Sequence, residues 1–252
     1  MMMKKKGIEI FPITGFPLIM QGDDIPFLIL SELKESEMTL QAGDIVVITH
    51  SIISISEGKI YQVDKIEASE RAKKISLNMG ISAEKAEVAL REAAEVLRET
   101  PVLITRTKHG IITDLSGIDE SNAPQGAVVA LPDDPDQSAR KISESLSRSF
   151  AFNVPVIITD TQGRPWRKGA VNIAVGVAGM SPFTHNSGKE DIYGYELRGS
   201  LVCLADQIAS SAELVMGQAD EGIPVVIVRG VDFEKDDGSA SKIVRSDSEN
   251  LF

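Results

Sequence analysis

The chain has 252 residues, of which 42% are hydrophobic and 25% charged, and its formal net charge is −11. This length gives room for one large domain or for two intertwined lobes around a substantial core. The acidic balance argues against a nucleic-acid-binding protein, which needs a basic surface to displace counterions from phosphates, but it leaves room for a small anionic substrate in a locally basic pocket.

The N-terminal stretch superficially resembles a signal peptide. Its apolar run is broken by Glu9, Pro12, Thr14, Gly15 and Pro17, and no small-residue cleavage site follows, so a strand at residues 7–13 is expected instead. No segment approaches the roughly 18 uninterrupted apolar residues of a membrane span. The single cysteine, Cys203, gives no intrachain disulfide, which suits a reducing compartment. The sequence thus predicts a soluble, cytoplasmic protein without membrane or nucleic-acid partners.

Strands are predicted where short runs rich in valine, isoleucine and threonine are bounded by glycine, proline or aspartate. These runs are 7–13, 44–53, 102–107, 110–115, 127–132, 155–160, 170–179 and 223–230. The residues TKHGII indicate a hairpin that pairs 102–107 with 110–115 in antiparallel fashion.

Helices are predicted at residues 82–99, 138–150 and about 199–216, where apolar residues recur at spacings of three and four. Ser82 can cap the first of them, Pro101 follows its end, and the aspartates of LPDDPDQSA cap the second. Because helices do not alternate strictly with strands, the pattern favours an α+β fold with a mixed sheet. One domain is expected over residues 7–232, followed by a polar, mobile tail at 233–252.

Several common catalytic motifs are absent from the sequence. It contains no phosphate-binding loop of the G-x-x-x-x-G-K-[ST] type, no G-x-G-x-x-G, no H-E-x-x-H and no G-x-S-x-G. The three histidines are scattered along the chain, so a metal site built from histidines is not expected. Acids and amides at strand ends remain as candidates.

Asp160 and Thr161 follow a predicted strand that is apolar on both faces. A carboxylate at such a position costs several kcal/mol unless it is paired or bound to a metal. Adjacent carboxylate and hydroxyl oxygens suit Mg²⁺ or Mn²⁺. The alternative is that Asp160 orders a T-Q-G turn through an Asx hydrogen bond.

Three further stretches allow both a functional and a structural interpretation. Asp119 and Asn122 lie in SGIDESNAP, a spacing that by itself favours a turn. The glycines of VMGQADEGIP let a ligand approach the backbone, although a plain helix-to-strand loop has the same composition. The cations of GRPWRKG, Arg164, Arg167 and Lys168, fit either an anionic substrate or a solvated turn.

Taken together, these stretches resemble the family of coenzyme F-420:L-glutamate ligases. The resemblance runs from about residue 8 to residue 232, and the order and spacing of ID-x-x-N, ITDT-x-GR and MG-x-x-D-x-GIP are its most specific parts. The stretches that resemble the family are FPITGFPLIMQGDD, GDIVVITHSIISISEG, SGIDESN, ALPDDPDQSA, IITDTQGRPWRKG, VNIAVGVAGM, KEDIYGYEL and VMGQADEGIPVVIVRG.

The resemblance implies a GTP-dependent ligase with an α+β fold peculiar to the family, acting as a homodimer. Such an enzyme joins L-glutamate to the lactyl carboxylate of the F-420 precursor through an acyl phosphate and then adds a second, γ-linked glutamate. It also implies Mg²⁺ or Mn²⁺, two ions per site, and K⁺.

The same resemblance assigns roles to individual residues. Asp119 and Asp160 are the expected catalytic residues. The expected metal ligands are Asp119, Asp160, Thr161 and Gln218. The expected nucleotide-binding residues are Phe16, Pro17, Leu18, Ile19, His50, Ser51, Asn122, Met216, Gly217, Gln218, Ala219, Asp220, Glu221, Gly222 and Ile223.

The sequence departs from the family pattern at two places. Where the family usually reads I-S-K-x-E-G, with the lysine expected on the nucleotide, this chain has Ile55, and His50 replaces a small hydroxyl residue. Two alternatives therefore stay open: a non-catalytic relative that binds a nucleotide or the deazaflavin, and a ligase for another carboxylate acceptor.

Overall fold

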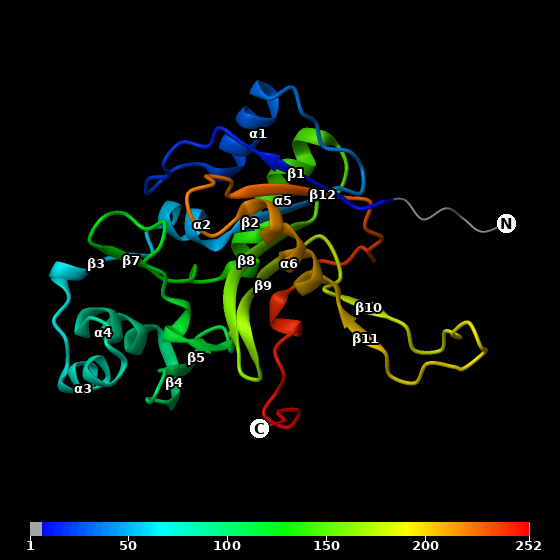
Figure 1. Ribbon diagram of the computed structural model, residues 1–252. Helices are drawn as coiled ribbons and strands as arrows, with labels where there is room; N and C mark the ends of the chain where they lie inside the picture. The colour runs from blue at the N-terminus through cyan, green and yellow to red at the C-terminus, as the bar shows by residue number, and fades with distance from the viewer. Residues whose placement is uncertain (1–6, 252) are drawn as a thin grey trace.

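The computed structural model describes residues 7–251, which surround a five-stranded sheet (Figure 1). The strands, in spatial order, are β1 (Glu9–Ile13), β12 (Val225–Arg229), β2 (Ile45–Thr49), β8 (Val156–Arg164) and β9 (Arg167–Ala178). Only β2 and β8 run parallel, and the other neighbours pair antiparallel. The predicted α+β fold with a mixed sheet is confirmed.

Helices cover both faces of this sheet. Alternate residues of a strand point to opposite faces, so each strand contributes to two cores. One core packs against α1 (Ile25–Glu35), α2 (His50–Ser56) and α5 (Pro135–Phe150), and the other against α6 (Leu204–Met216). Burial on both faces explains why these strands are almost continuously apolar in sequence.

A smaller lobe lies beside the sheet and has its own core (Figure 1). It contains β3 (Ile60–Gln62) paired with β7 (Ala127–Val129), and the sheet of β4 (Ala93–Arg98), β5 (Ile104–Thr107) and β6 (Ile112–Asp114). The helices α3 (Glu70–Met79) and α4 (Ala83–Glu92) pack against them. The predicted hairpin at TKHGII is confirmed by the antiparallel pairing of β5 with β6.

Two predicted elements have the wrong extent. The helix expected at 82–99 is capped by Ser82 as predicted but ends at Glu92, because the next residues pair with β5 as strand β4. The strand expected at 44–53 ends at Thr49, and the following isoleucines form α2, where they are buried in the core. In both cases tertiary packing overrides the local preference of the sequence.

Two helix starts also differ from expectation. The helix expected from 138 begins at Pro135, with the Asp134 side chain accepting the amide hydrogen of Gln137 as its N-cap. The helix expected from about 199 begins at Leu204, because the preceding residues form β11 (Leu201–Cys203), which pairs with β10 (Phe183–His185). The strands β10 and β11 carry an arm that projects from the body of the molecule (Figure 1).

Part of the C-terminal segment packs against the sheet. The carboxylate of Asp136, at the start of α5, accepts hydrogen bonds from the hydroxyl of Ser239 and the amide of Ala240, which is buried. In the described part of the chain, no helix combines the length and the apolar character needed to cross a bilayer.

Candidate active site

The site lies at the end of β2, where the β8–β9 hairpin extends beyond the rest of the sheet. The last pair between β2 and β8 joins Thr49 to Thr159, after which β8 pairs only with β9. Asp160 therefore lies within a strand, and the prediction that it ends one is wrong. The T-Q-G turn is also wrong, since β8 runs on to Arg164 and the chain turns at Pro165 and Trp166.

Asp160 and Asp119 lie around one buried histidine. His50, the first residue of α2, places its Nε2 3.2 Å from Oδ1 of Asp160 and is 4% exposed. Burial lowers the pKa of His50, but the carboxylates of Asp160 and Asp119 outweigh it and leave the pKa raised. Gly117 faces the other carboxylate oxygen of Asp160 so closely that an added Cβ would lie 3.3 Å from it.

Asp119 also forms the turn that the D-x-x-N spacing predicts. Its Oδ1 accepts hydrogen bonds of 2.8 Å from both the amide and the hydroxyl of Ser121. Asn122 follows with a positive φ of 52°, in the left-handed region that asparagine tolerates. The D-x-x-N spacing thus builds a turn and, at the same time, brings Asp119 within electrostatic reach of His50.

Thr161 and Gln218 form a second pair on the opposite face of β8. Neighbouring residues of a strand point to opposite faces, so Thr161 points away from the Asp160 side. The Nε2 of Gln218 donates to the Thr161 hydroxyl at 2.9 Å. The hydroxyl donates to Oδ1 of Asn172, its partner on β9, at 2.7 Å. Of the four expected metal ligands, Thr161 and Gln218 are in direct contact, and Asp119 and Asp160 form a looser pair whose charges both act on His50.

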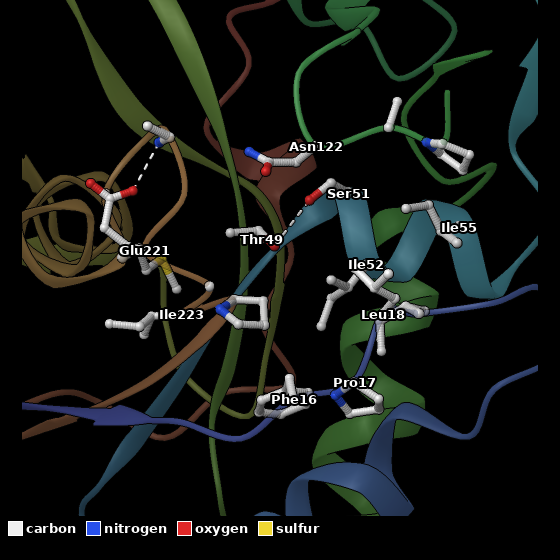
Figure 2. A pocket seen from close by; sticks show the side chains of 18 of the residues that line it. Phe16, Pro17, Leu18, Thr49, Ser51, Ile52, Ile55, Asn122, Glu221 and Ile223 are labelled. Carbon is white, nitrogen blue, oxygen red and sulfur yellow. Dashed lines mark hydrogen bonds between the residues drawn. The ribbon is translucent and has the colours of Figure 1, made fainter. Parts of the chain in front are cut away.

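A cavity of about 490 Å³ adjoins the second pair, and Gln218 belongs to its wall. The wall includes every residue of the predicted nucleotide set except His50, which is buried behind it, and Asp220. Figure 2 shows Phe16 and Pro17 at one end and Asn122 at the other, with Ser51 and Ile52 of α2 between them. Apolar side chains make up most of the lining, which is typical of small-molecule pockets.

The loop after α6 folds around the carboxylate of Glu221, one of its own residues. Gly217 ends the helix with a positive φ of 71°, and Glu221 packs against it so closely that a Cβ there would overlap its carboxyl group. The Glu221 carboxylate accepts the amide hydrogen of Ala219 at 2.8 Å (Figure 2). Hydrogen bonds from the backbone amides of Ala219, Glu221 and Gln218 lower the pKa of Glu221. Successive amides that converge in this way suit an anion.

Both departures from the family pattern lie at the site. Ile55 lines the cavity and is 6% exposed, so an apolar side chain stands where the family usually has a cation. Of the hairpin cations, Arg164 is committed to the turn, because its guanidinium donates to the carbonyl oxygens of Lys168 and Gly169.

The spacing of the Thr161 and Gln218 oxygens fits a divalent cation that completes its coordination with waters and a substrate. Among residues 7–251, no three histidine, cysteine, aspartate or glutamate side chains are arranged to hold a metal. Mg²⁺, however, is commonly held by one or two protein ligands plus waters and phosphate oxygens. The Thr161 Oγ and Gln218 Oε1 atoms lie 3.2 Å apart. That is close to the edge of a Mg²⁺ octahedron, roughly 3 Å for ligands at about 2.1 Å.

Two residues of this network could not be identified from the sequence. Asn172 is 4% exposed and bonds to Thr161, and Glu213 of α6 accepts a hydrogen bond from Gln218 at 2.7 Å. Asn172 lies in the family-like stretch VNIAVGVAGM, which assigned it no role, and Glu213 lies in no such stretch. The register of β8 with β9 and the position of α6 along the edge of β9 bring them into place.

Several known proteins that are similar to this chain share one name. The family model described as F420-0:Gamma-glutamyl ligase matches residues 14–230. The chain is 42% identical over 249 residues to the Coenzyme F420:L-glutamate ligase of Methanothermobacter thermautotrophicus, covering 98% of this chain and 99% of that protein. The proteins of the same name from Methanopyrus kandleri and Archaeoglobus fulgidus are 42% and 39% identical, with coverage of 98% and 97% of this chain and 99% and 96% of theirs. The chain belongs to the F420-0:gamma-glutamyl ligase family.

Proposed function

We propose that the protein is a GTP-dependent ligase that adds L-glutamate to the coenzyme F420 precursor, first at the lactyl carboxylate and then through a γ-linkage. The observation that supports this most strongly is the position of Gln218. It lines the large cavity and also bonds to Thr161, so a nucleotide in the cavity would end beside the paired polar ligands. The relatives' names supply the acceptor and the amino acid.

The proposed reaction first activates the acceptor. An oxygen of the acceptor carboxylate attacks the γ-phosphorus of GTP, and the bond to the GDP oxygen breaks. The glutamate amine then attacks the acyl carbon, phosphate leaves, and the amine loses a proton. Divalent cations, when bound, would offset the repulsion between the carboxylate and the triphosphate.

The chain's own residues would bind and orient the reactants. The apolar wall around Phe16 and Ile52 would exclude water from the nucleoside, and Ser51 and Asn122 offer polar groups at the other side of the cavity. The amides of the loop after α6, which bond to the Glu221 carboxylate here, would receive phosphate oxygens in its place. Asp119 with Asp160, and Thr161 with Gln218, would hold the cations. Rigid strands place such ligands accurately.

Mass spectrometry tests this proposal directly. The protein is incubated with the F420 precursor, GTP, Mn²⁺ and L-glutamate. Stepwise mass increases of one glutamyl residue, with equal amounts of GDP and phosphate released, are the expected result. No mass increase with any combination of nucleotide and divalent cation would refute it.

Ile55 favours a second candidate, a non-catalytic relative that binds the nucleotide or the deazaflavin without turnover. An isoleucine in the cavity wall supplies no charge to a phosphate. In the same experiment, binding without a mass change would support this candidate. A mass increase only with a different carboxylate would support a ligase for another acceptor.

The proposal also includes a homodimer, K⁺ dependence and a cytoplasmic location, all of which rest on the family resemblance. Exposed apolar side chains on the β10–β11 arm, Ile192, Tyr193 and Tyr195, support a partner for that arm, since each is at least 61% exposed. Sedimentation equilibrium would give twice the mass of the chain for a dimer.

A further inference from the structure

The outer edge of the sheet is covered by side chains of α6. β9 is the last strand of its sheet, and its outward backbone groups have no neighbouring strand. Glu213 accepts the amide hydrogen of Asn172 at 3.1 Å, and Asp206 accepts that of Ala174 at 2.9 Å. The Ser210 hydroxyl donates to the carbonyl oxygen of Asn172. These bonds satisfy an edge that would otherwise be open to further pairing.

Glu213 differs from Asp206 because its second oxygen reaches the site. Its Oε1 accepts a hydrogen bond from Nε2 of Gln218 at 2.7 Å. An ionised carboxylate only accepts hydrogen bonds, so the nitrogen end of the Gln218 amide must face it. A flipped amide would place two oxygens in repulsive contact. Glu213 thereby holds the amide nitrogen on its own side and the amide oxygen on the opposite side.

The hydroxyl of Thr161 is fixed in a similar way. It donates its hydrogen to Oδ1 of Asn172 at 2.7 Å, a shorter contact than the 3.2 Å to Oε1 of Gln218. Asn172 is 4% exposed, so this acceptor is held in the interior. The hydroxyl oxygen also accepts the hydrogen bond from Nε2 of Gln218, which leaves it one lone pair. That lone pair and the amide oxygen, 3.2 Å away, have the spacing of two ligands of one cation.

We infer that Glu213 is a positioning residue for a divalent cation at Thr161 and Gln218. It holds the Gln218 amide with Nε2 toward Glu213, so that Oε1, 3.2 Å from the Thr161 hydroxyl, faces away from that carboxylate. The inference rests on the proposed function, because it requires that this pair binds a cation. Outer partners that orient metal ligands typically change metal affinity by about 10- to 100-fold when they are replaced.

The variant Glu213→Gln tests this role. Its amide would face two N–H donors, from Asn172 and Gln218, with only one oxygen to accept them. The Gln218 side chain would lose its fixed orientation. The matched control is Asp206→Asn, which removes the same charge from the same helix about two turns away and touches neither member of the pair.

Mn²⁺ binding is measured for each folded protein in the presence of GDP, by loss of the free-ion signal in electron paramagnetic resonance. We expect Glu213→Gln to weaken the binding of Mn²⁺ at one site by about tenfold or more and Asp206→Asn to leave it unchanged. Equal affinity in Glu213→Gln and the wild type, or an equal loss in both variants, would overturn the inference. If Glu213→Gln does not fold, Glu213→Asp makes the same prediction, because its carboxylate retracts from Gln218.

A double variant separates positioning from direct coordination. If Glu213 acts through Gln218, adding Glu213→Gln to Gln218→Ala causes no further loss of affinity. A further tenfold loss would show that Glu213 binds the ion itself and would overturn the positioning role. A wild-type protein that binds no Mn²⁺ with GDP would instead refute the cation sites of the proposed function, which is a different result from equal binding in wild type and variant.

Discussion

Asp160 is the residue on which the proposed chemistry depends most. Its carboxylate faces the buried imidazole of His50 on one side and the backbone at Gly117 on the other, with Asp119 nearby. We expect Asp160→Ala to fold but to lose glutamate ligation by at least roughly 100-fold, the upper range for disturbing a metal's surroundings. Excess Mn²⁺ should not restore it. Rates are measured by release of phosphate, with thermal unfolding as the control for folding, and wild-type rates in this variant would remove Asp160 from the mechanism.

A substitution of the single residue Ile55 tests whether GTP binding can be strengthened. A lysine at this position would place an ammonium group in the cavity wall, where a charged hydrogen bond contributes about 1.5–3 kcal/mol. We expect Ile55→Lys to bind GTP roughly tenfold more tightly and to unfold at a lower temperature than the wild type without nucleotide, since the charge is then buried and unpaired. Ile55→Met is the uncharged control. Unchanged affinity by calorimetry would mean that the missing cation is immaterial here.

The roles of individual residues could be predicted where a sequence motif determines the local structure. They could not be predicted where the contacts depend on how strands pair and where a helix packs. The residues around Phe16 and Gly217 were expected to bind one ligand, and they do gather around one cavity. No role was predicted for Asn172, although it lies in a family-like stretch, or for Glu213, which lies in none. Their roles arise because β8 pairs with β9 at one register and α6 lies along the outer edge.

At the scale of elements, a buried ionic cluster joins the smaller lobe to the main sheet. Glu92, the last residue of α4, is 7% exposed and lies 3.3 Å from Nζ of Lys59 and 3.2 Å from Nζ of Lys108. It also accepts a hydrogen bond from Tyr61, and Lys59 pairs in turn with Asp133 before α5. Burial raises the pKa of Glu92, but Tyr61, Lys59 and Lys108 outweigh it, so the pKa is lowered.

We expect Glu92→Gln to reduce the free energy of unfolding by about 2 kcal/mol at neutral pH, because it removes charged hydrogen bonds from the largely buried Lys59. Lys59 would keep its pair with Asp133, and the half-exposed Lys108 loses little. A lowered pKa contributes stability that is present above the ordinary value of 4.5 and is lost as the pH falls through the folded value. The difference between wild type and variant should therefore shrink below that pH. Urea unfolding at several pH values measures this.

The control for this cluster is Glu70→Gln, which breaks the exposed pair with Lys73. Exposed pairs contribute little, so its unfolding curves should match the wild type. Equal stability of Glu92→Gln and the wild type at neutral pH would show that the Glu92 carboxylate does not stabilise the fold.

The sequence predicted whether a segment is a helix or a strand better than it predicted where that element ends. The apolar runs of the central sheet and the capped starts at Ser82 and Asp134 gave the right element types. The prediction that the helix continues past Glu92 was wrong, because the next residues pair with β5 in the smaller lobe. That pairing depends on residues beyond the helix, so no local pattern reveals it.

At the scale of the whole molecule, the mixed sheet was predictable because helices and strands do not alternate regularly along the sequence. The distribution of the proposed metal ligands over two faces of the sheet was not predictable. The proposed ligands come from three separate parts of the chain, and β8 divides them between its two faces. Asp160 and Thr161 are adjacent in sequence, and their oxygens together suit one Mg²⁺ or Mn²⁺. The alternation of the strand separates them, which favours two cation sites.

A crystal structure of the protein with GDP and Mn²⁺, with anomalous scattering recorded for manganese, tests the proposed arrangement most directly. We expect one manganese peak at Asp119 and Asp160, a second at Thr161 and Gln218, and the guanine nucleotide in the cavity that Gln218 lines. A bound nucleotide with manganese at neither pair would contradict it.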